Sequence, residues 1–331
     1  MSAAPVLCAL VAFASAAAEA NDVPARYMGD GSIVRLPANE NSTQVWHLAA
    51  MRKYKLDKKY GFTLQLVPAA TSQMTATAIQ SGQAEIGIFQ FLDIARMRKA
   101  GIRIIGVGPF LQWGADHFVV PVDSKVKNIG DLKGKKIGLF SRSSLDWILD
   151  QAIAKNVYKM DVERDLIVQE GAVGLIRGLI ETGQLDGAHM YNNLTPAMVA
   201  SGKVKVLHQM KELVDQLGLP AIPFLFYSAP EAYLASKPQN IRAFLAAYRE
   251  AVAILNKEDD VWFEHGKSLQ MTPESIILLR DEMRVDLWPT FRPTTEADMK
   301  KVFEFLLKEA GPVPLGGLSE YPEGFMTREY Q

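Results

Sequence analysis

The sequence predicts an α/β protein of two lobes, type II periplasmic-binding-protein-like in layout, each lobe a mostly parallel sheet flanked by helices. Three observations support this prediction. Strand-like and helix-like segments alternate with short connections from residue 33 to about residue 207, which is typical of parallel sheets covered by helices. A pattern from the first half of this region recurs about a hundred residues later. Beyond residue 228 the alternation gives way to amphipathic helices, which we expect to lie on lobe one.

The first series of elements consists of short apolar runs separated by helical segments. Gly82 and Gly101 end two of the helices, at positions where the left-handed conformation favours glycine. The expected strands are 33–36, 62–67, 86–89 and 102–107, and the expected helices are 43–53, 74–81 and 92–99.

The repeated pattern joins a helix end to a buried strand. Ile79-Gln80-Ser81-Gly82-Gln83-Ala84-Glu85 closely matches Ile180-Glu181-Thr182-Gly183-Gln184-Leu185-Asp186. Upstream, strand 64–67 corresponds to 166–169, and strand 33–36 corresponds to 137–140. Two copies of one α/β unit predict two lobes of similar fold, and chance similarity in helix-glycine-strand punctuation is the alternative.

The chain is expected to cross between the lobes twice. Strand 116–121 opens the second lobe, so the first crossing is placed near 112–116 and the return near 224–228. Lobe one then comprises 33–112 plus 228–331, and lobe two 113–227. Two crossings predict a hinge with a ligand cleft between the lobes. The four C-terminal helices are expected at 238–255, 259–269, 273–283 and 295–310.

Composition excludes several classes of protein. Thirty-six basic and thirty-seven acidic side chains give a formal charge of −1, which disfavours a nucleic-acid partner. The single cysteine, Cys8, excludes an internal disulfide, a cysteine-based zinc site and an iron–sulfur cluster. No histidine pair has metal-ligand spacing, and no nucleotide-binding fingerprint or nucleophile elbow is present. We therefore expect no catalytic residue, no metal and no cofactor.

The N-terminus is apolar and rich in alanine. Its apolar stretch, 6–14, is too short to span a bilayer as a helix. Ala14, Ala16 and Ala18 form the small-x-small patterns that a signal peptidase requires. We interpret 1–18 as a signal peptide that directs the protein to the periplasm, although the usual positive residues at its start are missing. An alanine-rich disordered N-terminus is the alternative.

One segment carries a family resemblance. Val122-Asp123-Ser124-Lys125-Val126-Lys127-Asn128-Ile129-Gly130-Asp131-Leu132-Lys133-Gly134-Lys135-Lys136-Ile137-Gly138-Leu139 resembles the start of the second lobe in type II periplasmic solute-binding proteins of ABC importers. It is most similar to the nitrate/sulfonate/taurine branch, which also contains thiamine-pyrimidine-precursor binders. Within it, Asp131 is expected to cap a helical turn that Gly134 ends.

The resemblance implies a monomeric receptor. It would deliver a small polar or anionic organic ligand, of the sulfonate, nitrate or taurine class, to an ABC importer membrane permease by hinge closure. An enzyme of the same fold acting on a pyrimidine-like substrate is the alternative. Met190-Tyr191-Asn192-Asn193 stands where many relatives carry an aromatic-acid-Pro stretch, so the ligand's identity does not carry over.

Candidate ligand-binding residues lie in the loops after the strands, because ligands of open α/β sheets bind beyond the strands' carboxyl ends. Hydroxyls, amides and aromatic rings there suit a small polar ligand, and Arg142 would complement an anion. The alternatives are helix capping for the hydroxyls, a solvated surface charge for Arg142 and core packing for the tryptophans. The predicted residues are Asn41, Ser42, Thr43, Trp46, Thr71, Ser72, Gln73, Phe89, Gln90, Trp113, Ser141, Arg142, Ser143, Ser144, Tyr191 and Asn192.

Overall fold

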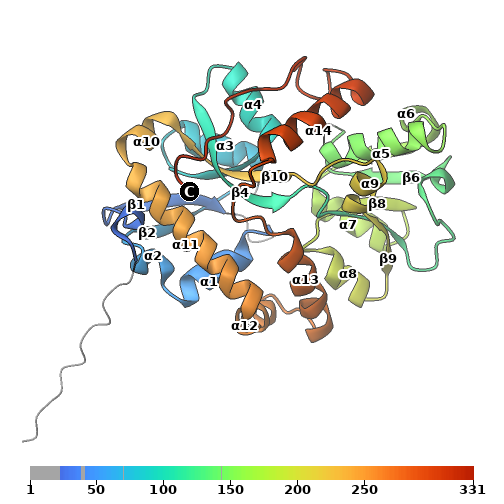
Figure 1. Ribbon diagram of the computed structural model, residues 1–331. Coiled ribbons are helices and arrows are strands. Elements are labelled where there is room, and N and C mark those ends of the chain that lie inside the picture. The colour runs from blue at the N-terminus through green and yellow to red at the C-terminus, as the bar shows by residue number, and fades with distance from the viewer. Residues whose placement is uncertain (1–22, 39–41, 70, 143) are drawn as a thin grey trace, which may run out of the picture.

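A computed structural model of the chain describes residues 23–38, 42–69, 71–142 and 144–331. It has two α/β lobes, with the strands β4 and β10 between them in Figure 1. The predicted signal peptide lies outside the described residues. Within the described residues, no helix combines the length and the apolar character needed to cross a membrane.

Lobe one contains two small sheets. In the first, β1 (Ile33–Ala38) pairs in parallel with β2 (Thr63–Pro68). In the second, β10 (Pro223–Pro230) lies between β3 (Gly87–Gln90) and β4 (Ile104–Gln112) and is antiparallel to both. The helical elements of this lobe are η1 (Ala25–Tyr27), α1 (Val45–Lys53), α2 (Leu56–Lys59), α3 (Ser72–Gln80), α4 (Phe91–Lys99) and α10 (Glu231–Ser236).

Lobe two contains one five-stranded sheet. Its strand order is β7-β6-β8-β5-β9, with β6 parallel to β7 and β8 and with β5 antiparallel to its neighbours. The strands are β5 (His117–Pro121), β6 (Lys136–Leu139), β7 (Ile167–Glu170), β8 (Gly187–Met190) and β9 (Val204–Gln209). The helical elements are η2 (Ile129–Leu132), α5 (Leu145–Asn156), α6 (Val162–Asp165), α7 (Val173–Glu181), α8 (Thr195–Ala200) and α9 (Met210–Gln216).

The repeated turn has the same backbone conformation and the same type of hydrogen bond in both lobes. Gly82 and Gly183 both have a φ of 71°, which a residue with a side chain rarely adopts. In lobe one Glu85 Oε2 accepts from the backbone N–H of Arg35 at 2.6 Å, and in lobe two Asp186 Oδ2 accepts from that of Lys136 at 2.9 Å. The shared acid therefore ties each turn to the first strand of its own unit, fifty residues upstream in both cases.

The turn before β6 differs from the expectation for Asp131. Asn128, not Asp131, is the N-cap residue of η2, and the Asn128 side chain forms no capping hydrogen bond. Asp131 lies inside the turn, and its Oδ2 accepts from the backbone N–H of Lys127 at 2.9 Å. The Asp131 expectation was wrong because the turn starts three residues earlier. Gly134 has the expected left-handed φ, 77°.

Strand β4 ends at Gln112 in a lobe-one sheet, and β5 begins at His117 in the lobe-two sheet. The return comes earlier in the chain than 224–228, because β10 already pairs with β4 at Pro223 and Gln112. The whole of β10 thus belongs to a lobe-one sheet.

The C-terminal helices divide their contacts between the lobes. Helices α11 (Pro238–Lys257) and α12 (Asp260–Ser268) pack against α1 of lobe one. In contrast, α13 (Pro273–Asp286) packs against α12 and also α8, and α14 (Thr295–Ala310) packs against α5. Figure 1 shows α14 and α13 on opposite sides of the crossing strands. These two helices are therefore not confined to lobe one.

The apolar core consists of three clusters, one of which extends across both lobes. One cluster fills lobe one around Trp46, Tyr227 and Tyr248. A second runs from Phe91 of α4 through Phe303 of α14 to Trp147 of α5, and so joins the lobes through α14. A third, smaller cluster lies in lobe two.

Candidate functional site

Loops from the two lobes meet where β1 and β8 end. Thr43, just before α1, donates from Oγ1 to Asn192 Oδ1 at 3.0 Å. Both side chains are buried, Asn192 completely. Two residues predicted for the site from sequence, one in each lobe, are therefore in direct contact.

Asn192 makes two further links that fix its position. Its backbone N–H donates to Asp116 Oδ1 at 3.0 Å, beside the first crossing. Its Nδ2 lies 3.4 Å from the Met283 sulfur of α13. The loop after β8 is thus attached to lobe one, to the crossing and to the C-terminal helices at a single residue.

An aromatic pair lies beside this junction. The rings of Phe140 and Tyr191 are 4.3 Å apart at their centroids, and Tyr191 is 37% exposed. Burial, followed by the nearby charges of Asp116 and Asp146, raises the pKa of Tyr191 to about 12. An accessible ring next to two carboxyl groups can stack on a flat ligand while the carboxyls accept hydrogen bonds.

A buried group of acids and imidazoles underlies the junction. Asp146, in the first turn of α5, accepts from Trp113 Nε1 at 3.2 Å. Asp150, one turn later, lies 2.5 Å from His189 Nε2 and 3.4 Å from His208 Nε2. Among the described residues, no set of histidine, cysteine and acidic side chains has the arrangement of a metal site.

The surroundings shift the titration of these groups in different directions. Burial, reinforced by the neighbouring carboxylate, raises the pKa of Asp116 well above its usual range. Burial raises the pKa of Asp146 to about 6, although the charge of His189 opposes this. Burial alone would raise the pKa of Asp150, but the nearby His189 and His208 outweigh it, so the pKa is lowered. The pKa of His189 is raised, because its carboxylate neighbours outweigh its burial. These directions favour the charged forms of Asp150 and His189, which lie in contact, and the protonated forms of Asp116 and Asp146.

Sequence reasoning missed Asp116, Asp146, Asp150 and Phe140. One signal was available: Asp146 and Asp150 stand four residues apart on the helix that follows a predicted strand, so they share one helix face. Asp116 carried no comparable signal, because only the fold brings it next to Asp146.

Arg142 turns toward other residues of lobe two. Its Nη1 forms an ion pair with Glu163 of α6, and its Nε lies 4.0 Å from Glu170 at the end of β7. Its Nη2 also donates to the carbonyl of Val168 at 3.3 Å. The guanidinium, whose side chain is 43% exposed, therefore already has acidic partners.

The predicted hydroxyls at two helix starts act as caps. Thr71 Oγ1 accepts from the Met74 N–H at the start of α3, and Ser144 Oγ accepts from the Trp147 N–H at the start of α5, both at 3.2 Å. A capping bond leaves other backbone N–H groups of the first turn unpaired by the helix, so these caps are compatible with ligand binding.

The other predicted residues are distributed between core and surface. Trp46 stacks on Trp262 with ring centroids 5.1 Å apart, and Trp46, Phe89 and Trp113 are all buried. Thr71, Ser72 and Gln73 are exposed, whereas Ser42, Gln90 and Ser141 are half-buried. Asn41 and Ser143 lie outside the described residues.

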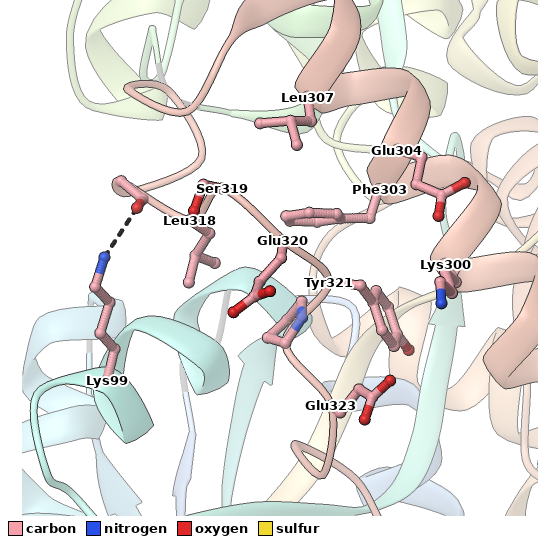
Figure 2. Close-up of a pocket in the computed structure, with 12 residues that line it drawn as sticks. Lys99, Lys300, Phe303, Glu304, Leu307, Leu318, Ser319, Glu320, Tyr321 and Glu323 are labelled. Carbon is pink, nitrogen blue, oxygen red and sulfur yellow. Dashed lines mark hydrogen bonds between the residues drawn. The ribbon is translucent and has the colours of Figure 1, made fainter.

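Two surface hollows lie away from this junction. The larger, of about 880 Å³, is lined by α14, the C-terminal segment and Lys99 of α4 (Figure 2). The smaller, of about 510 Å³, lies around the turn after α7. Neither is lined by a residue predicted for the site.

Known structures share this two-lobed architecture. The periplasmic aliphatic sulphonate binding protein SsuA from Escherichia coli has a TM-score of 0.66 at 17% identity, over 83% of this chain and 87% of that chain. The alkanesulfonate-binding protein SsuA from Xanthomonas axonopodis pv. citri, bound to MOPS, has a TM-score of 0.70 at 14% identity, over 91% and 99%. The desulfurization enzyme DSZB has a TM-score of 0.62 at 15% identity, over 91% and 96%. These matches confirm the predicted fold.

Sequence comparison assigns the family. No curated protein sequence matches this chain. The family described as NMT1/THI5 like matches residues 58–260, which is more than half of the 331 residues and includes the whole of lobe two. This match, together with the fold, confirms the resemblance carried by residues 122–139. The chain therefore belongs to the NMT1/THI5-like family.

Proposed function

We propose that this protein is an extracytoplasmic solute receptor that binds a small polar organic molecule between its lobes and delivers it to an ABC importer. The observation that carries the proposal is the bond between Thr43 and Asn192. It joins the loops after β1 and β8, at the carboxyl ends of strands, where ligands of this class of fold bind.

Binding without chemistry is the mechanism. A solute that contacts both lobes binds the closed arrangement more tightly than the open one, so it shifts the population toward closure. The importer permease would then recognise the closed form. The structural similarity to the sulfonate-binding SsuA proteins supports this role and a periplasmic location, as does the predicted signal peptide.

The charged groups beside the contact between Thr43 and Asn192 suggest which classes of solute to test. A sulfonate, nitrate or taurine-like anion is the first class to test, because of the structural relatives. A solute with N–H donors is the second, because Asp116 and Asp146 lie beside the accessible Tyr191 ring, whereas Arg142 is paired with Glu163. A zwitterion such as taurine carries both kinds of group.

Native mass spectrometry of the protein purified from its own host is the direct test. We expect a retained small molecule that is released on denaturation and that rebinds to the emptied protein. A protein that carries no solute and binds none from a host metabolite extract would contradict the proposal.

An enzyme acting on a pyrimidine-like substrate is the other candidate, since the fold also hosts the desulfurization enzyme DSZB. The two are separated by incubating the identified solute with the protein. Recovery of the solute unchanged supports a receptor, and conversion to a product on a timescale of minutes supports an enzyme.

A further inference from the structure

Helix α13 is firmly attached to lobe one. Arg284 Nη2 pairs with Asp259 Oδ1 at 2.8 Å, and Arg284 Nε donates to the Leu255 carbonyl at 2.9 Å. Leu279 and Met283 are fully buried in the lobe-one cluster. Any rotation of lobe two relative to lobe one must therefore move lobe two against α13.

The other side of α13 presents two acids to lobe two. Glu282 Oε1 lies 3.4 Å from His117 Nε2 on β5, and Asp286 Oδ1 lies 3.7 Å from Lys211 Nζ on α9. Both basic partners belong to lobe two, so both contacts cross the boundary between the lobes. Helix α8, which also packs against α13, carries no charged residue.

Burial makes these contacts sensitive to protonation. Asp286 is 2% exposed, and neither its Oδ1 nor Glu282 Oε2 has a hydrogen-bond partner among the described residues. Burial raises the pKa of Asp286 to about 6; Lys211 and His117 oppose the shift and Glu282 adds to it. Asp116, beside the first crossing, is a further charged neighbour, and Asp286 contributes to its raised pKa.

We propose that the acids Glu282 and Asp286 of α13, set against His117 and Lys211, make lobe closure respond to pH, so that proton uptake favours the closed arrangement. This inference concerns the regulation of the proposed receptor and rests on that function for its biological meaning. Opening would hydrate Asp286 and separate it from its partners.

The sign follows from linkage. A carboxyl group that binds its proton more tightly in the closed arrangement stabilises that arrangement as the pH falls. With a pKa of about 6 when closed and 3.8 when hydrated, lowering the pH from 7 to 5 should raise the ratio of closed to open molecules about tenfold. The ratio of closed to open molecules should change mainly between pH 3.8 and about pH 6, the two pKa values of Asp286.

The experiment measures closure without any ligand. Spin labels are placed at Gln83→Cys in lobe one and Gln184→Cys in lobe two, two exposed and equivalent positions of the repeat, in a Cys8→Ser background. Distance distributions from pulsed electron resonance are recorded at pH 7 and pH 5. We expect the distance found in this structure to gain population at pH 5 in the parent protein.

Two variants test the assignment. Asp286→Asn should populate the closed distance equally at both pH values, whereas Asp281→Asn, a 58% exposed acid of the same helix that pairs with Arg280, should respond like the parent. Lys211→Met removes a positive charge that lowers the pKa of Asp286, so it should move the pH-dependent change in closure to higher pH. This variant tests the proposal if Asp286→Asn does not fold. The proposal would be overturned if the distances in the parent protein did not change with pH, or if Asp286→Asn and Lys211→Met responded to pH as the parent does. Solute retention is measured separately, so the failure of either proposal is recognised independently.

Discussion

Thr43 and Asn192 stand 149 residues apart in the chain, and their side chains meet at 3.0 Å between the two lobes. A buried hydrogen bond of this kind contributes about 0.5–1.5 kcal/mol net. Because the two residues belong to different lobes, we expect the free energy of this bond to contribute to the proposed closure of the lobes.

Thr43→Val should lower the population of closed molecules about two- to tenfold, because valine keeps the shape and loses the donor. The spin-label pair described above measures this at constant pH. Thr77→Val is the matched control, since the Thr77 hydroxyl bonds only to the Gln73 carbonyl within α3. Equal closure in the two variants would show that the bond between Thr43 and Asn192 does not hold the lobes together.

Arg142→Ala should change the affinity for the solute by less than about twofold, because the guanidinium is engaged by Glu163 and Glu170 on a half-exposed surface. Titration calorimetry with the solute recovered from the host measures this. Glu163→Gln serves as the comparison, since it releases the arginine. A loss of ten- to a hundredfold in Arg142→Ala would instead establish the anion-binding role that the sequence suggests.

Asp146→Asn should flatten the dependence of stability on pH. The pKa of Asp146 is raised to about 6 in the folded protein from an ordinary 3.8, so the folded state binds the proton more tightly and loses stability as the pH rises from about 4 to about 6. The amide keeps an acceptor for Trp113. Urea unfolding should therefore show the variant more stable than the parent at pH 7, by at most about 3 kcal/mol.

The control for that measurement is Asp123→Asn, an exposed acid of the same lobe. It should follow the parent at every pH. If Asp146→Asn is less stable than the parent at pH 7, the carboxylate charge is needed to balance His189, and the expected pH dependence is contradicted.

The two repeated acids should differ in their contribution to stability. The Glu85 side chain is 12% exposed and also pairs with the Arg35 guanidinium, whereas the Asp186 side chain is 45% exposed. Glu85→Ala should lower the free energy of unfolding by about 1–3 kcal/mol, and Asp186→Ala by less than about 1 kcal/mol. Urea unfolding measures both. Glu85→Gln, which keeps an acceptor for the Arg35 N–H, should recover part of the loss, and a full loss there would assign the effect to the ion pair.

Export is tested at the N-terminus. The mature protein should begin between Ala17 and Ala20, because cleavage follows a small-x-small triplet. N-terminal sequencing of protein from the cell envelope gives the answer directly. An intact Met1 on protein from that compartment would contradict the signal-peptide interpretation.

Much of the fold could be predicted because its signals are local. The elements whose bounds the sequence analysis gave, chiefly those of lobe one and the C-terminal helices, lie within a few residues of the observed ones, and the repeat anticipated the matching turns at Gly82 and Gly183. Asp131 was misplaced because a carboxyl group can bond to several nearby N–H groups, and only the backbone path of the turn selects the Lys127 N–H.

The candidate site was predictable only in part. The sequence analysis chose the loops that follow the strands, and the structure brings Thr43 and Asn192 of two such loops into contact. The direction of Arg142 could not be predicted, because its partners Glu163 and Glu170 follow 21 and 28 residues later on separate elements. The acids around Asp146 were missed because their importance comes from burial, which no local pattern reveals.

Local elements, the repeated turn and the family resemblance could be recognised in the sequence, because helix caps, glycine conformations and apolar periodicity act over a few residues. Three features became visible only in the folded protein: α13 and α14 reach lobe two, Asp286 is buried beside Lys211, and Asn192 joins three parts of the chain. The physical reason is that these features depend on desolvation and contact between distant surfaces, which exist only after the lobes have packed.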